Sequence, residues 1–598
     1  MARPLLGLVA LSALLLGPSA AYSESTPNGS AHAGTGPIPI EAFSSSQTNL
    51  PTTEDAWDIP GVVLIDTLDD LGEADEASLL QGLRSHFPDV RFEDTDLERQ
   101  TGIHVAVVSP DEEAALIAES SRDSRVEGAE PLAWVAAQFV PNDPLYKDQW
   151  HMKRVGAESA WDFATGRGVT VAVVDTGIAC ENHGPFTKGT DLASTQCVEG
   201  WNLVANNTHA NDDQGHGSHV AGTIAQSTNN GIGAVGLAFD ARLMPVKVLN
   251  ASGFGTTADV ADGIRWAADH GAQVINLSLG GPRNSKVLQD AVDHARKQGA
   301  IVVAAAGNSG GAVGYPGGCV GAVGVSATDP DDKLAKFSSR GPEVDIAAPG
   351  VNVVQQTICE GGKNKCEVYP GYSGTSMASP HVAGAAALLV SLGVSDPDAI
   401  EQKLEGSARV VDDSAAGKKL YGAGILDAAN AVRKVTFEHA AMRLGMLLGL
   451  SLLVSMMARR KNAKSSSPLR PAFVLGGLLA GPGLLFFAPL VLSRVHLGVD
   501  LLSRPLGDLD LYVGASLHKL LPLANALVPA VLTAVTFHSK PLRLFTAGIA
   551  VGTAAYLGSV AVLAESAAPF GSAALSVWCA VNAIGCMLIA RLNLAEAK

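Results

Sequence analysis

The chain has 598 residues, which is too many for a single domain. Its charge is uneven, because residues 439–598 hold 13 basic and 5 acidic side chains, net +8, whereas the remainder holds 29 and 54, net −25. An acidic main part argues against binding to the phosphate backbone of nucleic acids, so no nucleic-acid partner is expected.

The N-terminus, residues 1–21, has the pattern of a secretory signal peptide. Arg3 precedes the apolar run Leu5–Leu16, and small residues follow up to Ala21. The run is short for a membrane span, although an uncleaved anchor is the alternative. Residues 22–58 are rich in Ser, Thr, Gly and Pro, so they predict a disordered linker without a core.

Residues 59–135 predict a small α+β module, since strand-like and helix-like spacings alternate along them. An acidic module between an export signal and a larger domain indicates an inhibitory pro-segment that assists folding. Its tail, Ala133–Pro141, is then expected in the groove of the next domain. An accessory domain that stays attached is the alternative. The expected elements are strands at 62–65, 103–108 and 126–129 and helices at 76–87 and 112–121.

Two apolar runs that predict buried strands end in polar side chains. The run Gly168–Val174 ends at Asp175, and the run Ile301–Ala306 ends close to Asn308. In open parallel α/β sheets, ligands bind at the carboxyl ends of the strands. A buried carboxylate there needs a partner, so Asp175 and Asn308 are predicted site residues.

His216 is the predicted partner of that carboxylate. It lies between two glycines within Asp212–Thr223, at the start of a small-residue helix, where it can face a cleft. His219 follows three residues later, and we expect it to point into the packing of the helix. The pair lacks a nearby third ligand, so the spacing does not predict a zinc site.

Ser376 lies within Gly371–His381, where a turn of small residues leads into an Ala-rich run, Val382–Val390, that predicts a buried helix. At a helix N-terminus, unpaired backbone N–H groups and the helix dipole favour a developing negative charge. That is the setting of a nucleophile whose reaction forms an oxyanion. A loop that only caps the helix is the alternative.

These stretches resemble the motifs of the subtilisin-like serine proteases. The matching segments are Asp175–Gly177, His216–Thr223, Ala305–Asn308 and Gly374–His381, and the chain order Asp, His, Ser is also that family's order. The resemblance covers about residues 142–435. It implies an α/β fold with a subtilisin-like parallel sheet flanked by helices. In the whole chain, this domain is expected to be preceded by the small α+β pro-domain and followed by an all-α transmembrane bundle.

The resemblance also assigns roles. Ser376 is expected to be the nucleophile, His216 to take its proton and return it to the leaving amine, and Asp175 to orient His216. Asn308 and the backbone N–H of Ser376 are expected to form the oxyanion hole. This chemistry requires no cofactor. A catalytic domain that has lost its activity is the alternative.

The resemblance further implies a groove for a peptide or protein substrate, including a segment that pairs with the substrate backbone as an added strand. No acidic residue is evident around Ser309, so we expect an apolar or aromatic residue before the scissile bond. Asp212 and Asp213 give only weak support for a preference for basic pairs. The expected groove residues are Gly253, Phe254 and Gly255 for the pairing segment, and Ser278, Leu279, Gly280 and Gly314 for the first specificity pocket.

The loop Thr228–Gly236 resembles a calcium loop of the family. Asp191 and Asn230 would supply oxygen ligands, which suit calcium. The sequence therefore predicts a possible structural calcium, with an unmetallated turn as the alternative.

Five cysteines precede residue 439, and export to an oxidising compartment favours disulfides. Two of the cysteines bracket the loop after Asp175, and two bracket a second loop. The remaining cysteine lies in an apolar context and is expected to be a buried free thiol. The candidate pairs are Cys180 with Cys197 and Cys359 with Cys366, which leaves Cys319, and the sequence leaves the connectivity open.

The last segment, residues 439–598, predicts a transmembrane helical region with about five spans, because its apolar runs approach or meet the length that a bilayer requires. The catalytic domain is expected to end with a separate helix at Ala428–Val435. Gly481–Gly483 predicts that the second span is broken or re-entrant. The expected spans are 441–458, 472–493, 517–538, 542–564 and 569–590.

Basic residues cluster in three places in this region: residues 459–470, Lys540 with Arg543, and the C-terminus. With five spans, all three fall on one side of the membrane, the cytoplasmic side. The catalytic domain then lies outside the cytoplasm, in agreement with the signal peptide. We therefore expect a multi-pass protein of the cell membrane that contacts the lipid bilayer.

The resulting prediction is a membrane-anchored serine endopeptidase that hydrolyses peptide bonds through an acyl-enzyme. One alternative in the same class is a dedicated processing protease with one native substrate. The alternative of a different class is a membrane sensor or transporter whose protease-like domain acts mainly as a peptide-binding module.

Overall fold

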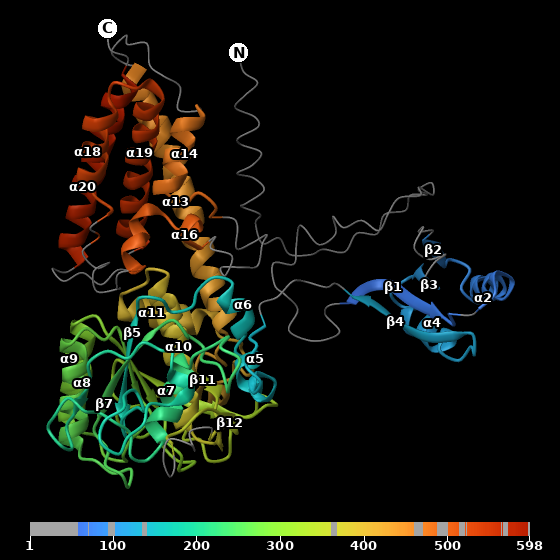
Figure 1. Ribbon diagram of the computed structural model, residues 1–598, viewed down its shortest axis with the longest axis horizontal. Coiled ribbons are helices and arrows are strands. Elements are labelled where there is room, and N and C mark those ends of the chain that lie inside the picture. The colour runs from blue at the N-terminus through green and yellow to red at the C-terminus, as the bar shows by residue number, and fades with distance from the viewer. Residues whose placement is uncertain are drawn as a thin grey trace. The chain divides into compact units, whose positions relative to one another are not determined.

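The computed structural model divides the chain into two compact units, Met1–Ala137 and Gln138–Lys598 (Figure 1). The predicted signal peptide and all but the last residue of the predicted linker lie outside the described residues. The structure describes residues 58–69, 71–93, 102–133, 140–359, 368–459, 470–486, 500–512, 521, 523–563, 565 and 572–595.

The first unit is an α+β module, as the sequence predicts. Its four strands form a sheet in the order β2-β3-β1-β4, with antiparallel pairing. Leu79 and Leu83 are buried on the longer helix and pack into the core of the module. Strand β2 has only three residues, too few for a spacing to predict it. The elements are β1 (Asp58–Thr67), α2 (Glu73–His86), β2 (Arg91–Glu93), β3 (Ile103–Val107), α4 (Glu113–Ser120) and β4 (Val126–Ala133).

The second unit contains a seven-stranded sheet in the order β11-β10-β9-β8-β5-β7-β6, and every pairing in it is parallel. Each residue of the interior strand β5 is buried. All carboxyl ends therefore lie at one edge of the sheet. The strands are β5 (Thr170–Asp175), β6 (Trp201–Asn202), β7 (Arg242–Lys247), β8 (Val274–Leu277), β9 (Ile301–Ala305), β10 (Ala322–Thr328) and β11 (Ile346–Pro349).

Helices cover both faces of this sheet. Val171 and Val173 of β5 pack into the core with residues of α7 and α10, whereas Ala172 and Val174 pack into the core with residues of α8 and α9. This is the alternation expected of a strand that is buried on both sides. The helices of this part are α5 (Trp150–Arg154), α6 (Ala157–Trp161), α7 (His216–Ala225), α8 (Thr257–Asp269), α9 (Lys286–Lys297), α10 (Thr375–Ser391), α11 (Pro397–Ser407) and α12 (Ala415–Tyr421).

Helix α13 corrects one boundary predicted from the sequence. The helix expected at Ala428–Val435 and the first expected span are a single helix of 32 residues, Ala428–Arg459. No Pro lies in this range and its Gly residues are isolated, so nothing breaks the backbone hydrogen bonds between the two parts. The catalytic domain therefore continues directly into the apolar region.

Among the described residues, three helices are long and apolar enough to cross a bilayer: Ala428–Met457, Lys540–Leu563 and Ala573–Leu594. The second expected span is interrupted: α14 ends at Ala480, just before Gly481 and Pro482, and residues 487–499 lie outside the described residues. The other elements of this region are α14 (Pro471–Ala480), α16 (Asp500–Ser503), η6 (Leu506–Tyr512), α18 (Leu527–Thr536), α19 (Lys540–Leu563) and α20 (Ser572–Leu594).

Candidate active site

Asp175 and His216 are in direct contact. Asp175 is the last residue of β5, His216 is the first residue of α7, and His216 Nδ1 lies 2.8 Å from Asp175 Oδ1. The carboxylate is fully buried, while the imidazole side chain is 25% exposed. Gly215, which precedes the helix, has a φ of +103°, a conformation that side chains other than hydrogen rarely permit.

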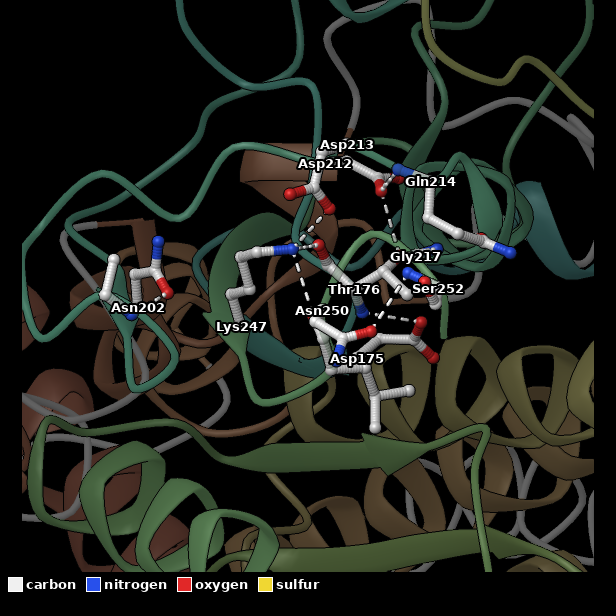
Figure 2. Close-up of polar contacts among 12 residues, drawn as sticks. Asp175, Thr176, Asn202, Asp212, Asp213, Gln214, Gly217, Lys247, Asn250 and Ser252 are labelled. Atoms are coloured by element: carbon white, nitrogen blue, oxygen red, sulfur yellow. Dashed lines mark hydrogen bonds and ion pairs between the residues drawn. The ribbon is translucent and has the colours of Figure 1, made fainter. Parts of the chain in front are cut away.

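Hydrogen bonds of Thr176 tie the end of β5 to the start of α7. Its hydroxyl donates to Asp212 Oδ1 at 2.9 Å and accepts the N–H of Gly217 at 2.9 Å (Figure 2). Asp212 Oδ1 also accepts the N–H of Gly215 at 2.9 Å. The residues on both sides of His216 are therefore held to the residue that follows Asp175.

Lys247, the last residue of β7, also holds the segments around Asp175 and His216 in place. Its buried ammonium donates to the carbonyl of Thr176 at 2.6 Å, to Asp213 Oδ1 at 2.6 Å and to the carbonyl of Leu249 at 2.9 Å (Figure 2). All three donors of the ammonium are used. The charge of Asp213, whose side chain is 31% exposed, is therefore paired with a buried lysine.

The electrostatics of His216 favour its charged form. Burial lowers the pKa of His216, but the charge of Asp175, the hydrogen bond to Asp175 and the charge of Asp212 outweigh burial, so the net pKa is raised. A histidine held in this way has one ring nitrogen fixed by the acid and presents the other to a reacting group.

Ser376 is the second residue of α10, as expected for a serine at a helix N-terminus. Its hydroxyl donates to the carbonyl of Ser278 at 3.0 Å, and the hydroxyl of Ser278 donates to the carbonyl of Ser376 at 2.8 Å. A hydroxyl has one proton, so giving it to His216 requires rotation about the Cα–Cβ bond of Ser376. Ser278 follows β8, the neighbour of β5, which places Ser376 and Asp175 at the ends of adjacent strands.

Asn308 lies beside the backbone of Ser376. Asn308 Oδ1 accepts the N–H of Thr375 at 2.8 Å and the hydroxyl of Thr375 at 2.9 Å, which leaves Nδ2 as the donor side of the amide. A β-carbon built on Gly374 would lie 3.3 Å from Asn308 Nδ2 and 3.7 Å from the backbone nitrogen of Ser376. Two donors therefore border the space that Gly374 leaves open.

The segments expected to form the first specificity pocket lie side by side. Gly281 and Tyr315 exchange two backbone hydrogen bonds, of 2.9 and 2.8 Å. A β-carbon on Gly314 would lie 3.1 Å from the carbonyl of Gly281, so these two walls approach closely. Leu279 is partly buried against the core on the side of α8 and α9.

The segment expected to pair with the substrate backbone is not a strand in this structure. Gly253, Phe254 and Gly255 follow a turn in which Asn250 Oδ1 accepts the N–H of Phe254 at 3.2 Å. The Phe254 side chain is exposed. An edge strand needs a partner for its backbone groups, so the strand predicted here would depend on a bound peptide.

His219 points into the packing of α7, as the sequence predicts. Its Nε2 lies 3.0 Å from the carbonyl of Val353 and 3.2 Å from the carbonyl of Pro370, and its ring stacks on Tyr372 with centroids 4.4 Å apart. Burial lowers the pKa of His219 to about 3, so it stays neutral. This histidine has a structural role.

Asp191 and Asn230, the expected calcium ligands, lie together but contact each other directly. Asp191 Oδ1 accepts Asn230 Nδ2 at 2.7 Å, and Asp191 Oδ2 accepts the N–H of Ala234 at 2.9 Å and the hydroxyl of Tyr369 at 3.3 Å. Asn230 Oδ1 accepts the N–H of Ile232 at 2.9 Å. Donors face the carboxylate, so the residues as they lie form a hydrogen-bonded turn and do not fit a cation.

A second group of carboxylates comes from residues that the sequence analysis did not single out. Oxygen atoms of Asp345, Glu401 and Glu405 lie within 4.8 Å of one another. Burial raises the pKa of Asp345 to about 7, and Arg296 contacts Glu401 at 2.9 Å. Arg296 therefore balances part of the charge of this cluster, and no metal is assigned to it.

The disulfide predicted between Cys180 and Cys197 is present and closes a loop with a sequence separation of 17 residues. Cys319 is a buried free thiol, as expected. Cys366, the expected partner of Cys359, lies outside the described residues.

The sequence analysis assigned no role to two residues of the site. Thr375, which orients the amide of Asn308, lies within the segment Gly374–His381, and Lys247, whose ammonium is buried, belongs to none of the motifs. A lysine inside the apolar stretch Leu243–Val248 was the one available signal, since a buried cation needs a partner.

A histidine paired with a buried carboxylate, at the sheet edge where a helix begins with Thr375 and Ser376, is an arrangement that serine hydrolases use. Comparison with known proteins agrees. The subtilase family model (peptidase S8) matches residues 166–424. The chain is 42% identical over 298 residues to thermitase of Thermoactinomyces vulgaris and 42% identical over 299 residues to subtilisin Savinase of Lederbergia lenta.

These two alignments cover 49% and 50% of this chain and 100% of each relative. A solved protease structure from Pseudoalteromonas arctica is 35% identical, with a TM-score of 0.43 over 50% of this chain and 100% of that one. A cold-adapted subtilisin-like serine proteinase is 33% identical, with a TM-score of 0.39 over 44% and 90%. The chain belongs to the subtilase family and is a subtilisin-like serine protease.

Proposed function

We propose that this protein is a membrane-anchored serine endopeptidase that uses Asp175, His216 and Ser376 as a catalytic triad. The observation that carries the proposal is the 2.8 Å contact between His216 Nδ1 and Asp175 Oδ1, at the sheet edge where Ser376 begins a helix. A carboxylate on Nδ1 selects the tautomer whose Nε2 is free to accept a proton.

In the proposed reaction, the hydroxyl of Ser376 turns from the carbonyl of Ser278 towards His216 when a peptide enters. His216 takes the proton while the oxygen attacks the peptide carbonyl, and the charge of Asp175 stabilises the imidazolium that forms. The imidazolium then protonates the leaving amine. Water repeats the sequence on the acyl-enzyme and frees Ser376.

Asn308 and the Ser376 N–H are proposed to bind the oxyanion of each tetrahedral intermediate. Support comes from the orientation of the amide: Thr375 occupies Oδ1, so Nδ2 is the side that can donate. Donors that are already oriented cost no reorganisation when the charge develops, so they lower the barrier most effectively.

We propose that the residue before the scissile bond is apolar or aromatic. Asp212 accepts several internal hydrogen bonds, and Asp213 is paired with Lys247. Asp212 is buried and hydrogen-bonded, and the charge of Asp213 is already balanced by Lys247, so both attract a basic substrate side chain less than an unpaired acid would. A substrate panel varied at this one position tests the proposal, and a preference for Lys or Arg there would contradict it.

Labelling with a fluorophosphonate probe tests the proposed mechanism directly. The full-length protein is expected to react at Ser376 and to cleave a casein-type substrate, and Ser376→Ala is expected to abolish both. Ser373→Ala is the matched control, because the Ser373 hydroxyl accepts a backbone N–H of Asn352 and has no proposed role in catalysis. Unchanged cleavage by Ser376→Ala would exclude the mechanism.

A sensor or transporter with a peptide-binding domain is the second candidate. It predicts that the full-length protein binds peptides but leaves them intact, and that Ser376→Ala binds them equally well. Turnover of a bound peptide by the unmodified protein, measured by mass spectrometry, excludes this candidate.

The five-span topology, with the catalytic domain outside the cytoplasm, is supported by contacts of two loops. Arg504, in the expected outer loop between the second and third spans, donates to the carbonyl of Ser391, and the carbonyl of Glu565, just after the fourth span, accepts the N–H of Ser395. Both loops follow expected spans that return to the outer side. Reporter fusions after residues 465 and 505 are expected on opposite sides of the membrane, and the same side for both would overturn this topology.

We propose that residues 1–21 are removed on export and that the module at 59–135 is an inhibitory pro-segment. N-terminal sequencing of the membrane-bound protein tests both cleavages. Ser376→Ala is expected to retain the module if removal is autocatalytic. Activity that is equal with and without the attached module would contradict an inhibitory role.

A structural calcium at Asp191 and Asn230 also stays a prediction. It requires Asn230 to turn its oxygen towards Asp191, which breaks the 2.7 Å contact between them. The expected result is a higher unfolding temperature with calcium than with a chelator, and Asp191→Asn should abolish the difference. An unchanged temperature favours the hydrogen-bonded turn.

A further inference from the structure

Two loops of the helical region contact the catalytic domain through its backbone. Arg504 Nη1 donates to the carbonyl of Ser391 at 2.6 Å, and Ser391 is the last residue of α10, the helix that begins beside Ser376. The carbonyl of Glu565 accepts the N–H groups of Ser395 and Asp396 at 2.8 and 2.9 Å. Each loop therefore binds close to the C-terminal end of α10.

A side-chain ion pair strengthens the contact at Glu565. The Glu565 carboxylate lies 2.8 Å from Lys403 Nζ of α11 and 2.6 Å from His439 Nε2 of α13, and the Glu565 side chain is only 8% exposed. Within the helical region, Arg443 of α13 lies 3.0 Å from Asp508, which is also buried and is close to Arg504 in the chain. Breaking a buried, paired contact leaves an uncompensated charge, so the pair of Lys403 and Glu565 resists separation of the helical region from the catalytic domain.

The contacts share one edge of the catalytic sheet. α13 packs against α6, which precedes β5 in the chain, and the N–H of Ala428 donates to the carbonyl of Val155, just before α6. α10 begins beside Ser278, at the carboxyl end of β8, and packs along the sheet, so its last residue lies towards the amino-terminal edge. Asp175 lies at the carboxyl edge, so the triad and the contacts with the helical region are at opposite ends of the strands.

The length of α10 gives the distance between Ser376 and the contact with the helical region. It is a continuous helix from Thr375 to Ser391, with Ser376 in its first turn and the contact with Arg504 at its last residue. At 1.5 Å per residue, Ser376 and Ser391 are about 22 Å apart along the helix axis.

We propose that the helical region acts as a spacer that holds the triad on the side of the catalytic domain away from the bilayer. The enzyme then cleaves flexible extracytoplasmic segments of exported or membrane-anchored proteins, but not peptide bonds at the membrane surface. This proposal rests on the proposed function, both the protease activity and the membrane anchoring.

The separation sets a minimum tether for a membrane-anchored substrate. A fully extended chain spans about 3.3 Å per residue, so about 7 residues are needed to cover 22 Å. A flexible Gly/Ser tether has a root-mean-square length of about 5–6 Å times the square root of its residue number, which reaches 22 Å at about 15 residues. Cleavage is therefore expected to rise between these two lengths.

The test uses the full-length enzyme in vesicles with single-span substrates that carry one cleavable sequence after Gly/Ser tethers of 3, 8, 15 and 25 residues. The 3-residue tether is expected to be cleaved at least ten-fold more slowly than the 25-residue tether. Equal rates for all tethers would overturn the proposal. The same sequence as a detached peptide is measured in parallel, and failure to cleave that peptide would count against the protease activity itself.

Removing the contacts tests the spacer directly. The double variant Arg504→Ala/Glu565→Ala is expected to speed cleavage of the 3-residue tether several-fold, with kcat/KM for the detached peptide within two-fold of the original. Lys286→Ala is the control, since Lys286 is exposed and pairs with Asp290 on its own helix. An unchanged length dependence in the double variant would show that these contacts do not hold the triad away from the membrane.

Discussion

The catalytic part and the helical part of the second unit distribute their polar and apolar side chains in opposite ways. The catalytic sheet buries its apolar residues, and β5 is buried along its whole length. In α20, large apolar side chains lie on the surface, while Arg443 and Asp508 are paired and buried at the start of the helical region. The exposed apolar residues of α20 are Val577, Val581, Ile584, Leu588 and Leu592.

This difference indicates that the catalytic part is surrounded by water and the helical part by lipid. In water, a folded domain is stable when its apolar side chains are buried. In the interior of a bilayer, the outer side chains must be apolar and the backbone groups must be hydrogen-bonded within each helix. The residues exposed on α20 recur at intervals of three and four, so they lie along one face. The chain thus joins a catalytic part that is suited to water to a helical part whose surface is suited to lipid.

The largest expected effect is at the carboxyl edge of the sheet. Asp175→Asn is expected to lower kcat by about 10⁴-fold, because an amide does not hold the productive tautomer of His216 or stabilise its charge. Asp175 raises the pKa of His216 against the effect of burial. The base must be neutral, so activity falls as the pH drops through this pKa.

Without the charge of Asp175, the pKa of His216 falls, and the acid limb of the pH–rate profile should move to lower pH in Asp175→Asn. Profiles of kcat/KM for a soluble peptide measure this shift. If the acid limb of Asp175→Asn stays in place, Asp175 does not raise the pKa of His216.

The second largest effect is expected for Asn308→Ala. Loss of one oxyanion donor typically costs about 10²–10³ in kcat, while KM should change little because the ground-state carbonyl gains less from the donor. Thr375→Ser is a useful companion, since it keeps a hydroxyl able to donate to Asn308 Oδ1. Steady-state kinetics on one peptide separate kcat from KM, and a rise in KM alone would contradict the proposed role.

A lysine placed on an exposed apolar residue distinguishes the two parts. Ile584→Lys, near the middle of α20, is expected to disfavour membrane insertion by about 3 kcal/mol. Val320→Lys, at an 82% exposed position of the catalytic part, should change stability by less than about 0.5 kcal/mol. An insertion assay and thermal unfolding provide the two measurements. Equal tolerance at both sites would mean that α20 does not face lipid.

The disulfide gives an effect confined to the catalytic part. Replacing Cys180 and Cys197 with Ser should lower the free energy of unfolding by about 3 kcal/mol, because the closed loop restricts the unfolded chain. Denaturant unfolding under non-reducing conditions measures this loss. The integrity of the helical region, followed by resistance of its loops to protease, should not change.

Local sequence predicted the elements that have a repeating pattern. The strands β5, β8 and β9 are runs of apolar residues that end at polar motifs, and α2 and α4 show helical spacing. Strands of two or three residues, such as β2 and β6, are too short to carry a period, so only their partners in the sheet define them. The predicted break in the second span follows from Gly481 and Pro482, whose backbone limits are local.

The sequence by itself determined the residue types of the site, the order of its motifs and the presence of an apolar C-terminal region, because each is written in a few adjacent residues. Only the tertiary structure decided that Ser376 donates to Ser278, that Thr375 orients Asn308, and that α13 runs unbroken out of the catalytic domain. Contacts between residues far apart in the chain depend on which strands are neighbours and how helices pack. No local pattern encodes those choices.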